Sequence, residues 1–186
     1  MFKIFLYQKI ADNSEIQNLI QAIGCGIGKN FSLSKMRYER IILMTDADVD
    51  GSHITTLLIT FFYKFMRGII ENGSLYLAMP PLFKLMNNKS VQYAFNEKDK
   101  NIILNKNNKI LYNITRFKGL GEMPAEQLRE TTMNPNNRNL IKITLNKGIK
   151  EVKKTEKIFD SLMGKKPEFR YKFIQENANF TNNLDF

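Results

Sequence analysis

The chain has 186 residues, 43% of them hydrophobic and 11% aromatic, which excludes a wholly disordered protein. Its 28 Lys and Arg against 18 Asp and Glu give a formal net charge of +10, and this excess favours a polyanionic partner, either nucleic acid or an anionic membrane surface. A single cysteine excludes an intrachain disulfide. Because no stretch approaches the ~20 apolar residues that span a bilayer, we expect a cytoplasmic protein that does not enter the membrane.

The first predicted helix runs from Ser14 to Ile23, with Ser14 as its N-cap. Apolar residues recur on one helical face, at positions 16, 19, 20 and 23. The glycine-rich stretch at 24–29 that follows is not a phosphate-binding loop, because Asn30 stands after Lys29 where such a loop needs Ser or Thr. We therefore interpret the first glycine as a helix C-cap and the rest as a connector to a basic loop.

An apolar strand is predicted at 41–45, and an acidic loop follows it directly. Three aspartates occupy alternate positions before Gly51: Asp46, Asp48 and Asp50. Alternate residues of an extended segment point to the same side, so we expect the three carboxylates to converge. Ser52 is a suitable N-cap for a helix that begins at His53 or Ile54. This arrangement places the acids at the carboxyl end of a strand, where open α/β sheets bind their ligands.

Converging carboxylates favour a hard cation. Oxygen donors with no cysteine nearby suit Mg²⁺, with Mn²⁺ or Ca²⁺ as possible substitutes. The alternative is a solvated acidic turn with no ligand. An EF-hand loop is excluded, because its twelfth position must be a bidentate glutamate and that position, counted from Asp46, is Leu57.

Further helices and strands are predicted after the acidic loop. A buried helix, apolar nearly all round, is expected from Ile54 to about Met66. A strand at 74–78 and a hairpin of 82–86 with 91–95 follow. Residues 96–112 form either a short surface helix or a loose connector.

The last third of the chain is also predicted to contain both helices and strands. We expect a strand at 114–117, a helix from Pro124 to about Thr132 and a strand at 140–145. Residues 147–172 are rich in lysine and suit a helix with one buried face, and a last helix is expected at 169–177.

A carboxylate cluster on a strongly basic chain indicates a phosphodiester substrate. Two divalent ions ~4 Å apart can stabilise both the attacking and the leaving oxygen of a displacement at phosphorus. This chemistry alone does not separate a nuclease from a primase, a polymerase or a topoisomerase.

A series of longer motifs runs through most of the chain: A-I-G-C-G-I-G at 22–28, M-T-D-A-D-V-D-G-S-H-I at 44–54, L-L-I-T-F-F-Y at 57–63, P-P-L-F-K at 80–84, R-F-K-G-L-G-E-M at 116–123, Q-L-R-E-T-T-M at 127–133 and M-G-K-K-P-E-F-R-Y-K-F-I-Q-E-N-A at 163–178. Together they closely resemble the B subunit of bacterial type IIA topoisomerases, DNA gyrase and topoisomerase IV. The last motif is more similar to topoisomerase IV.

This resemblance implies an α/β fold. Residues 1–85 would be an incomplete TOPRIM domain, Rossmann-like, with a mainly parallel sheet flanked by helices. Residues 86–186 would be a smaller α+β carboxyl-terminal segment of the same protein. The implied setting is the bacterial cytoplasm, in association with the nucleoid.

The resemblance also implies an activity and its residues. The family is an ATP-dependent DNA topoisomerase that cleaves and religates both DNA strands with Mg²⁺. Asp46, Asp48 and Asp50 match its catalytic metal ligands, and Lys118 and Arg116 lie in the motif that approaches DNA. The nucleophilic tyrosine is on the partner A subunit, so no tyrosine of this chain is a nucleophile. The ATP site of the family has no counterpart here.

Two departures from the family change the expectation for the isolated chain. The E-G-D-S motif that supplies a further metal-binding glutamate is not in this sequence, and residues 1–13 carry no family motif. The ATPase region is also absent from the sequence. We therefore expect a carboxyl-terminal fragment of a B subunit that neither cleaves nor relaxes DNA alone.

Two other functions stay open at this point. The chain could be a non-catalytic basic module that binds DNA or the A subunit. It could also be a free-standing TOPRIM nuclease or primase-like enzyme, in which case Glu15 or Glu122 would have to replace the missing glutamate.

Overall fold

A computed structural model describes most of the chain and divides it into two compact units, Met1–Thr144 and Leu145–Phe186. The described residues are 12–88, 90–106, 111–146 and 148–178. Within them, no helix is long and apolar enough to cross a membrane. The two compact units meet after Thr144. The domain boundary that we predicted at residue 85 stays a prediction.

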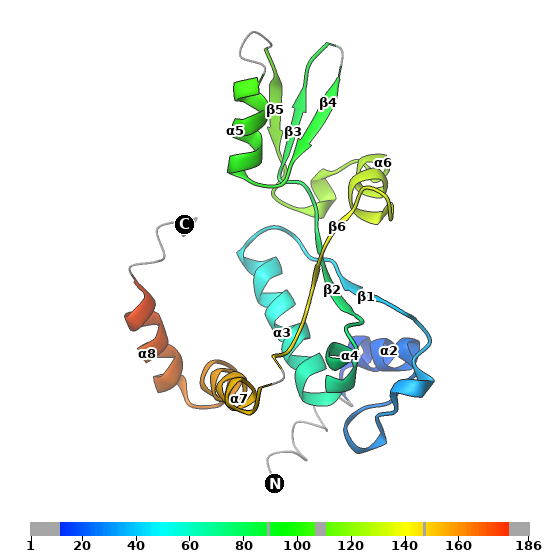
Figure 1. Ribbon diagram of the computed structural model, residues 1–186, viewed down its shortest axis with the longest axis vertical. Helices are drawn as coiled ribbons and strands as arrows, with labels where there is room; N and C mark the ends of the chain where they lie inside the picture. The colour runs from blue at the N-terminus through cyan, green and yellow to red at the C-terminus, as the bar shows by residue number, and fades with distance from the viewer. Residues whose placement is uncertain (1–11, 89, 107–110, 147, 179–186) are drawn as a thin grey trace. The chain divides into compact units, whose positions relative to one another are not determined.

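The first sheet of the larger unit is built on a βαβ unit (Figure 1). Strands β1 (Ile41–Leu43) and β2 (Leu75–Met79) are parallel. A parallel pair needs a crossover connection, which helices α3 (Val49–Phe65) and α4 (Arg67–Glu71) provide. The predicted α/β, Rossmann-like fold is thereby confirmed.

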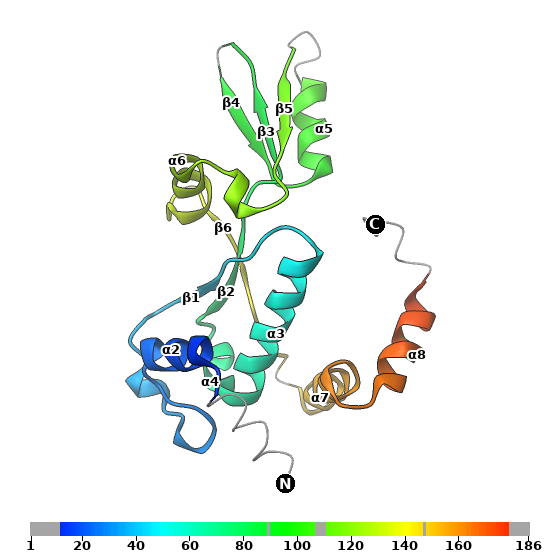
Figure 2. The same cartoon turned by 180° about the vertical axis from the view of Figure 1, so that it is seen from behind.

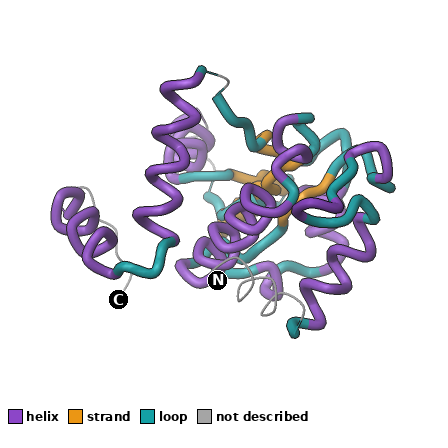
Figure 3. Tube along the Cα trace, turned by 90° about the horizontal axis from the view of Figure 1, so that it is seen from below, coloured by secondary structure: helices purple, strands orange, loops and turns teal. Residues whose placement is uncertain are grey.

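The third strand of this sheet comes from far along the chain. Strand β6 (Asn139–Lys142) pairs with β2 antiparallel, with Met79 opposite Asn139 and Tyr76 opposite Lys142. The order is β1-β2-β6, so the three described strands form one parallel and one antiparallel pair. Viewed from below, the strands lie among the helices of this unit (Figure 3).

The core of the first sheet lies where α3 ends and β2 begins. Its fully buried side chains include Phe62, Met66, Ile69, Ile70 and Leu75. The expectation that this helix is buried all round is wrong for its first turns. Those turns expose apolar side chains to solvent: Val49 by 64%, Ile54 by 51% and Leu57 by 47%.

A second, antiparallel sheet has the strand order β4-β3-β5. The predicted hairpin is present as β3 (Phe83–Met86) and β4 (Val91–Ala94). The expected strand at 114–117 is β5 (Asn113–Arg116), which pairs with the other side of β3.

Residues 96–112 contain a helix rather than a loose connector. Helix α5 (Glu97–Lys106) lies against the second sheet in both the front and the back view (Figure 2). Ile103 and Leu104 pack on the buried residues Phe83, Leu85 and Ala94. This helix therefore completes the small core of the second sheet.

Helix α2 (Ser14–Ile23) confirms the predicted helix but not its cap. Asn13 is the N-cap, and its Oδ1 accepts a hydrogen bond from the Ile16 N–H at 3.0 Å. Asn and Ser cap helices about equally well, and the asparagine one residue earlier makes the bond. The C-cap is Gly24, as predicted, with a left-handed φ of 83°.

The helix predicted at 124–132 is divided in the structure. Helix α6 (Ala125–Leu128) is a single turn, and a π-helical turn at Arg129–Met133 continues it. The hydroxyl of buried Thr131 donates a hydrogen bond to the Gln127 carbonyl at 2.8 Å.

The pKa of Tyr93 on β4 is raised by burial and, to a smaller extent, by the charge of Glu130.

In its described residues the second unit has two helices, α7 (Ile149–Met163) and α8 (Pro167–Asn177). Helices were predicted in this lysine-rich region, but the expected buried face is wrong, because neither helix has a buried residue. The Arg170 guanidinium joins them, because it donates to the Gly164 carbonyl at 2.6 Å and to the Leu162 carbonyl at 3.4 Å. Phe169, Tyr171 and Ile174 are exposed on α8.

Candidate functional site

The acidic loop lies at the carboxyl end of β1, as predicted, but its helix begins earlier. Helix α3 begins at Val49 and its N-cap is Asp48, whose Oδ1 accepts the Gly51 N–H at 2.7 Å. The predicted N-cap, Ser52, is wrong. Its hydroxyl instead donates to the Asp48 carbonyl at 2.9 Å, inside the first turn.

This earlier start changes how the three aspartates lie. Asp48 is extended, but Asp50 is already helical, so the three residues do not form one extended segment. Within the part of the chain that the structure describes, no three Asp, Glu, His or Cys side chains are gathered as a metal-binding group. The expected convergence is therefore not seen, and the role of the three as metal ligands stays a prediction.

Asp46 is joined to a distant part of the chain instead. Its Oδ1 accepts a hydrogen bond of 2.7 Å from the Leu120 N–H, 74 residues away in sequence. Gly119 lies directly against the same carboxyl group. A Cβ on Gly119 would lie 3.1–3.3 Å from the carboxyl atoms of Asp46. The acidic loop and the K-G-L-G-E motif thus form one structural unit.

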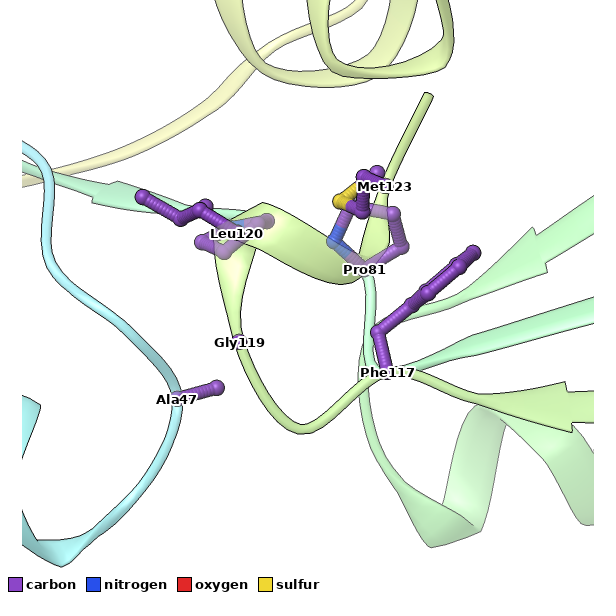
Figure 4. Close-up of a pocket in the computed structure, with 7 residues that line it drawn as sticks. Ala47, Pro81, Phe117, Gly119, Leu120 and Met123 are labelled. Atoms are coloured by element: carbon purple, nitrogen blue, oxygen red, sulfur yellow. The ribbon is translucent and has the colours of Figure 1, made fainter. Parts of the chain in front are cut away.

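The close-up of this contact shows Ala47 directed at the loop that carries Gly119 (Figure 4). Leu120 and Met123 of the motif line a small cleft together with Pro81 and Ala47. Phe117 and Met123 are buried on either side of the motif. The Phe117 N–H also donates to the Leu82 carbonyl at 2.9 Å, which ties the start of the motif to the residue before β3.

Gly51 makes the other close approach within the acidic loop. A Cβ at this position would overlap the backbone carbonyl of Asp46. The loop therefore folds back onto the first turn of α3, and Thr45 strengthens this fold. Its hydroxyl and that of buried Thr55 are hydrogen-bonded at 2.7 Å.

The two basic residues predicted to contact DNA lie at the start of the same motif. Arg116 ends β5 and Lys118 follows two residues later, and both are exposed. The Lys118 backbone N–H donates to Glu122 Oε2 at 2.8 Å. Glu122 therefore stabilises the motif's own turn.

Glu15, the other glutamate considered as a replacement for the missing one, lies in the first turn of α2, where a carboxylate interacts favourably with the helix dipole.

Cys25, in the glycine-rich connector, is fully buried. Burial raises the pKa of its thiol, an effect larger than the opposing influence of its backbone hydrogen bond. A thiol of this kind is a packing residue rather than a reactive nucleophile.

Sequence reasoning missed Gly119 and Leu120 as neighbours of Asp46. It singled out the lysine of K-G-L-G and not the residues that contact the acid. The signal that could have found them is the pair of glycines, since glycine in a motif often marks a close approach of two backbones.

Comparison with known proteins identifies both segments. A model of the Toprim domain matches residues 4–80, and a model described as DNA gyrase B subunit, carboxyl terminus, matches residues 109–175. The Toprim match includes most of 1–13, where we expected no resemblance. The βαβ unit with its acidic loop is therefore the core of a Toprim domain.

Full-length relatives extend this result to nearly the whole chain. It is 46% identical to the DNA gyrase B subunit of Metamycoplasma hominis over 180 residues, which is 96% of this chain. It is 48% identical over 95% of its length to the gyrase B subunit of Halalkalibacterium halodurans, and 47% identical over 95% to that of Spiroplasma citri. The chain spans 27% of the length of each.

The chain therefore belongs to the family of type IIA topoisomerase B subunits, of which it represents the Toprim and carboxyl-terminal part. These relatives carry the gyrase name, so they favour gyrase over the topoisomerase IV resemblance of the chain's last motif.

Proposed function

We propose that this chain forms part of an ATP-dependent type IIA DNA topoisomerase and provides Mg²⁺ ligands for double-strand cleavage and religation. The observation that carries the proposal is the contact between Asp46 and Leu120, because it joins the family's two motifs, the acidic loop and K-G-L-G-E, in one place. The proposed ligands are Asp46, Asp48 and Asp50.

The donor set fits a hard cation in its chemistry. Asp46 and Asp48 each use one carboxylate oxygen for a backbone N–H, at 2.7 Å in both cases. Within the described residues, the second carboxylate oxygen of each makes no hydrogen bond or ion pair, and the Asp50 carboxylate makes none. Carboxylate oxygens held in this way by neighbouring donors suit Mg²⁺.

A bound Mg²⁺ would supply positive charge to the oxygens of the phosphate that reacts. The chain's own contribution is to hold the carboxylates in place and to bind the DNA backbone. Lys118 and Arg116, which are exposed at the start of the motif that contacts Asp46, are the proposed phosphate contacts. The nucleophilic tyrosine would come from the A subunit and ATP hydrolysis from other parts of the full-length protein.

A chimeric protein tests the proposal directly. Residues 12–178 would replace the equivalent region of a related DNA gyrase B subunit, and the chimera would be assayed with its A subunit for Mg²⁺-dependent supercoiling. We expect activity that is lost when Asp46, Asp48 and Asp50 are changed to Asn together. A chimera that keeps its activity with all three substituted would refute the ligand assignment.

The isolated chain is expected to behave differently. Mixed with an A subunit, Mg²⁺ and supercoiled plasmid, it should neither cleave nor relax the DNA, since the E-G-D-S glutamate is not in this sequence. Relaxation by the isolated chain would contradict this part of the proposal.

A non-catalytic module that binds DNA or the A subunit is the second candidate. It is favoured by the net charge of +10 and by the exposure of Arg116 and Lys118. It predicts DNA binding that weakens steeply with salt and survives Asp46→Asn. A free-standing nuclease or primase-like enzyme is less well supported, because the similarity to gyrase B subunits covers 95% of the chain.

A further inference from the structure

The Asp46 carboxylate is the only one of the three acidic-loop carboxylates that, within the described residues, is bonded to a distant segment. Asp48 is bonded inside its own turn, to Gly51. The donor to Asp46 is the Leu120 N–H, at 2.7 Å. A hydrogen bond from a fixed neighbour to one oxygen of a ligating carboxylate sets the direction of the other oxygen.

The donor segment is held in place at both ends. Phe117 and Met123 are each 6% exposed, and the Phe117 N–H donates to the Leu82 carbonyl at 2.9 Å. Between them, Glu122 Oε2 accepts the Lys118 N–H at 2.8 Å. A short 3₁₀ turn is closed by the Glu122 N–H, which donates to the Gly119 carbonyl at 3.2 Å. The Leu120 N–H takes no part in that turn, so it is available to Asp46.

Gly119 favours this close approach through space rather than through conformation. Its φ of −145° is extended backbone that any residue adopts. A Cβ would nevertheless lie 3.1 Å from the Asp46 Cγ and 3.2–3.3 Å from its oxygens. By contrast, a Cβ on Gly121, two residues on, would meet nothing within 4 Å. The turn is thus open on one side and closely fitted to the carboxylate on the other.

We propose that Phe117–Met123 is a positioning arm for Asp46. The Leu120 N–H holds Oδ1, and Gly119 leaves room for the carboxylate, so that Oδ2 is presented to a divalent cation. This inference rests on the proposed function, because it assigns the arm's purpose to the cation that Asp46 would bind. Leu120 and Gly119 are positioning residues and touch neither cation nor DNA in this proposal.

Comparison of two substitutions at Leu120 isolates the effect of its N–H donor, because both remove the leucine side chain and only one removes the N–H. Leu120→Pro deletes the N–H, and proline is tolerated at the first position of a helical turn that follows an extended residue such as Gly119. Leu120→Ala removes the side chain but keeps the N–H. The affinity of the full chain for Mn²⁺ alone, followed by electron paramagnetic resonance, is measured for both.

We expect Leu120→Pro to weaken Mn²⁺ binding by about 10–100-fold, the usual effect of losing a group that orients a ligand. Leu120→Ala should bind Mn²⁺ within about 3-fold of wild type, since the orienting N–H is intact. Melting temperatures measured in EDTA report folding independently of the cation. Equal Mn²⁺ affinities for the two variants would overturn the positioning role.

The glycine pair provides a second test if the proline variant does not fold. Gly119→Ala is expected to weaken Mn²⁺ binding, whereas Gly121→Ala should leave it unchanged. Wild-type affinity in Gly119→Ala would also overturn the inference. Failure of the proposed function gives a different pattern, in which the wild-type chain binds no Mn²⁺ or binds it unchanged after Asp46→Asn.

Discussion

Asp48 accepts the Gly51 N–H at 2.7 Å, so one carboxylate is both the N-cap of α3 and a proposed cation ligand. These two roles can be separated by substitution, because an amide oxygen caps a helix about as well as a carboxylate but carries no charge. The acidic loop therefore has a structural requirement that is independent of any metal.

Asp48→Ala should destabilise the larger unit by about 1 kcal/mol through loss of the cap, and Asp48→Asn should cost much less. Urea unfolding followed by circular dichroism in EDTA measures both. Both variants should lose Mn²⁺ affinity. If the two variants were equally destabilised, the cap would not be the source of the effect.

Gly51→Ala should destabilise the protein, although Gly→Ala inside a helix ordinarily stabilises it by up to ~1 kcal/mol. The sign is reversed because the new methyl group would overlap the Asp46 carbonyl. Overpacking of this kind costs about 1–3 kcal/mol. Thermal unfolding measures the change, with His53→Ala, at an exposed position of the same turn, as the control. A stabilised Gly51→Ala variant would contradict the described loop.

Thr45 and Thr55 should be energetically coupled through the hydrogen bond between their hydroxyls, which measures 2.7 Å. A double-mutant cycle of Thr45→Val, Thr55→Val and the double variant isolates this term. We expect a coupling free energy of about 0.5–1.5 kcal/mol. Additive changes in the free energy of unfolding would show that the bond does not hold the loop to α3.

Lys118→Gln should weaken DNA binding uniformly across sequences and lower the slope of log affinity against log salt by about 0.9, the value for one lost phosphate contact. Fluorescence anisotropy at several salt concentrations measures the slope. Lys64→Gln, at an exposed position in the last turn of α3, is the charge-matched control. Equal slopes for the two variants would remove Lys118 from the proposed DNA contacts.

Arg170→Ala should loosen the contact between α7 and α8, because the guanidinium bonds two carbonyls at the helix junction. Loss of a hydrogen bond from a charged donor typically costs about 1.5–3 kcal/mol. Hydrogen exchange of the α8 amides should become faster. Lys172→Ala, which removes only an exposed pair with Glu176 at 3.8 Å, should change it little.

Most elements of the fold could be predicted from local sequence patterns. The hairpin at β3 and β4 and the helix α2 have clear periodicity, and their positions were correct to within a few residues. Helix α7 ends at Met163, earlier than the 147–172 predicted. The start of α3 was missed because Asp48 and Ser52 are both good N-cap residues, and only the folded loop selects between them. The π-helical turn after α6 was missed because its sequence has the ordinary helical period.

The candidate site was predictable only in part, for a different reason. The acidic loop and the K-G-L-G-E motif could each be identified in sequence, but the contact between Asp46 and Leu120 spans 74 residues. No local pattern encodes such a contact. The pairing of β6 with β2 is also distant in sequence and was likewise not foreseen.

The pairing of β2 with β6 has a consequence for where the sequence can accept insertions and deletions. Met79 ends β2 and lies opposite Asn139, the first residue of β6. The polypeptide between them, which contains the second sheet, therefore departs and returns at adjoining points, like a cassette inserted into the parent sheet. Insertions and deletions at the tips of this cassette can be tolerated without moving either junction. The stretch that reaches back to Asp46 must keep its distance from the junctions.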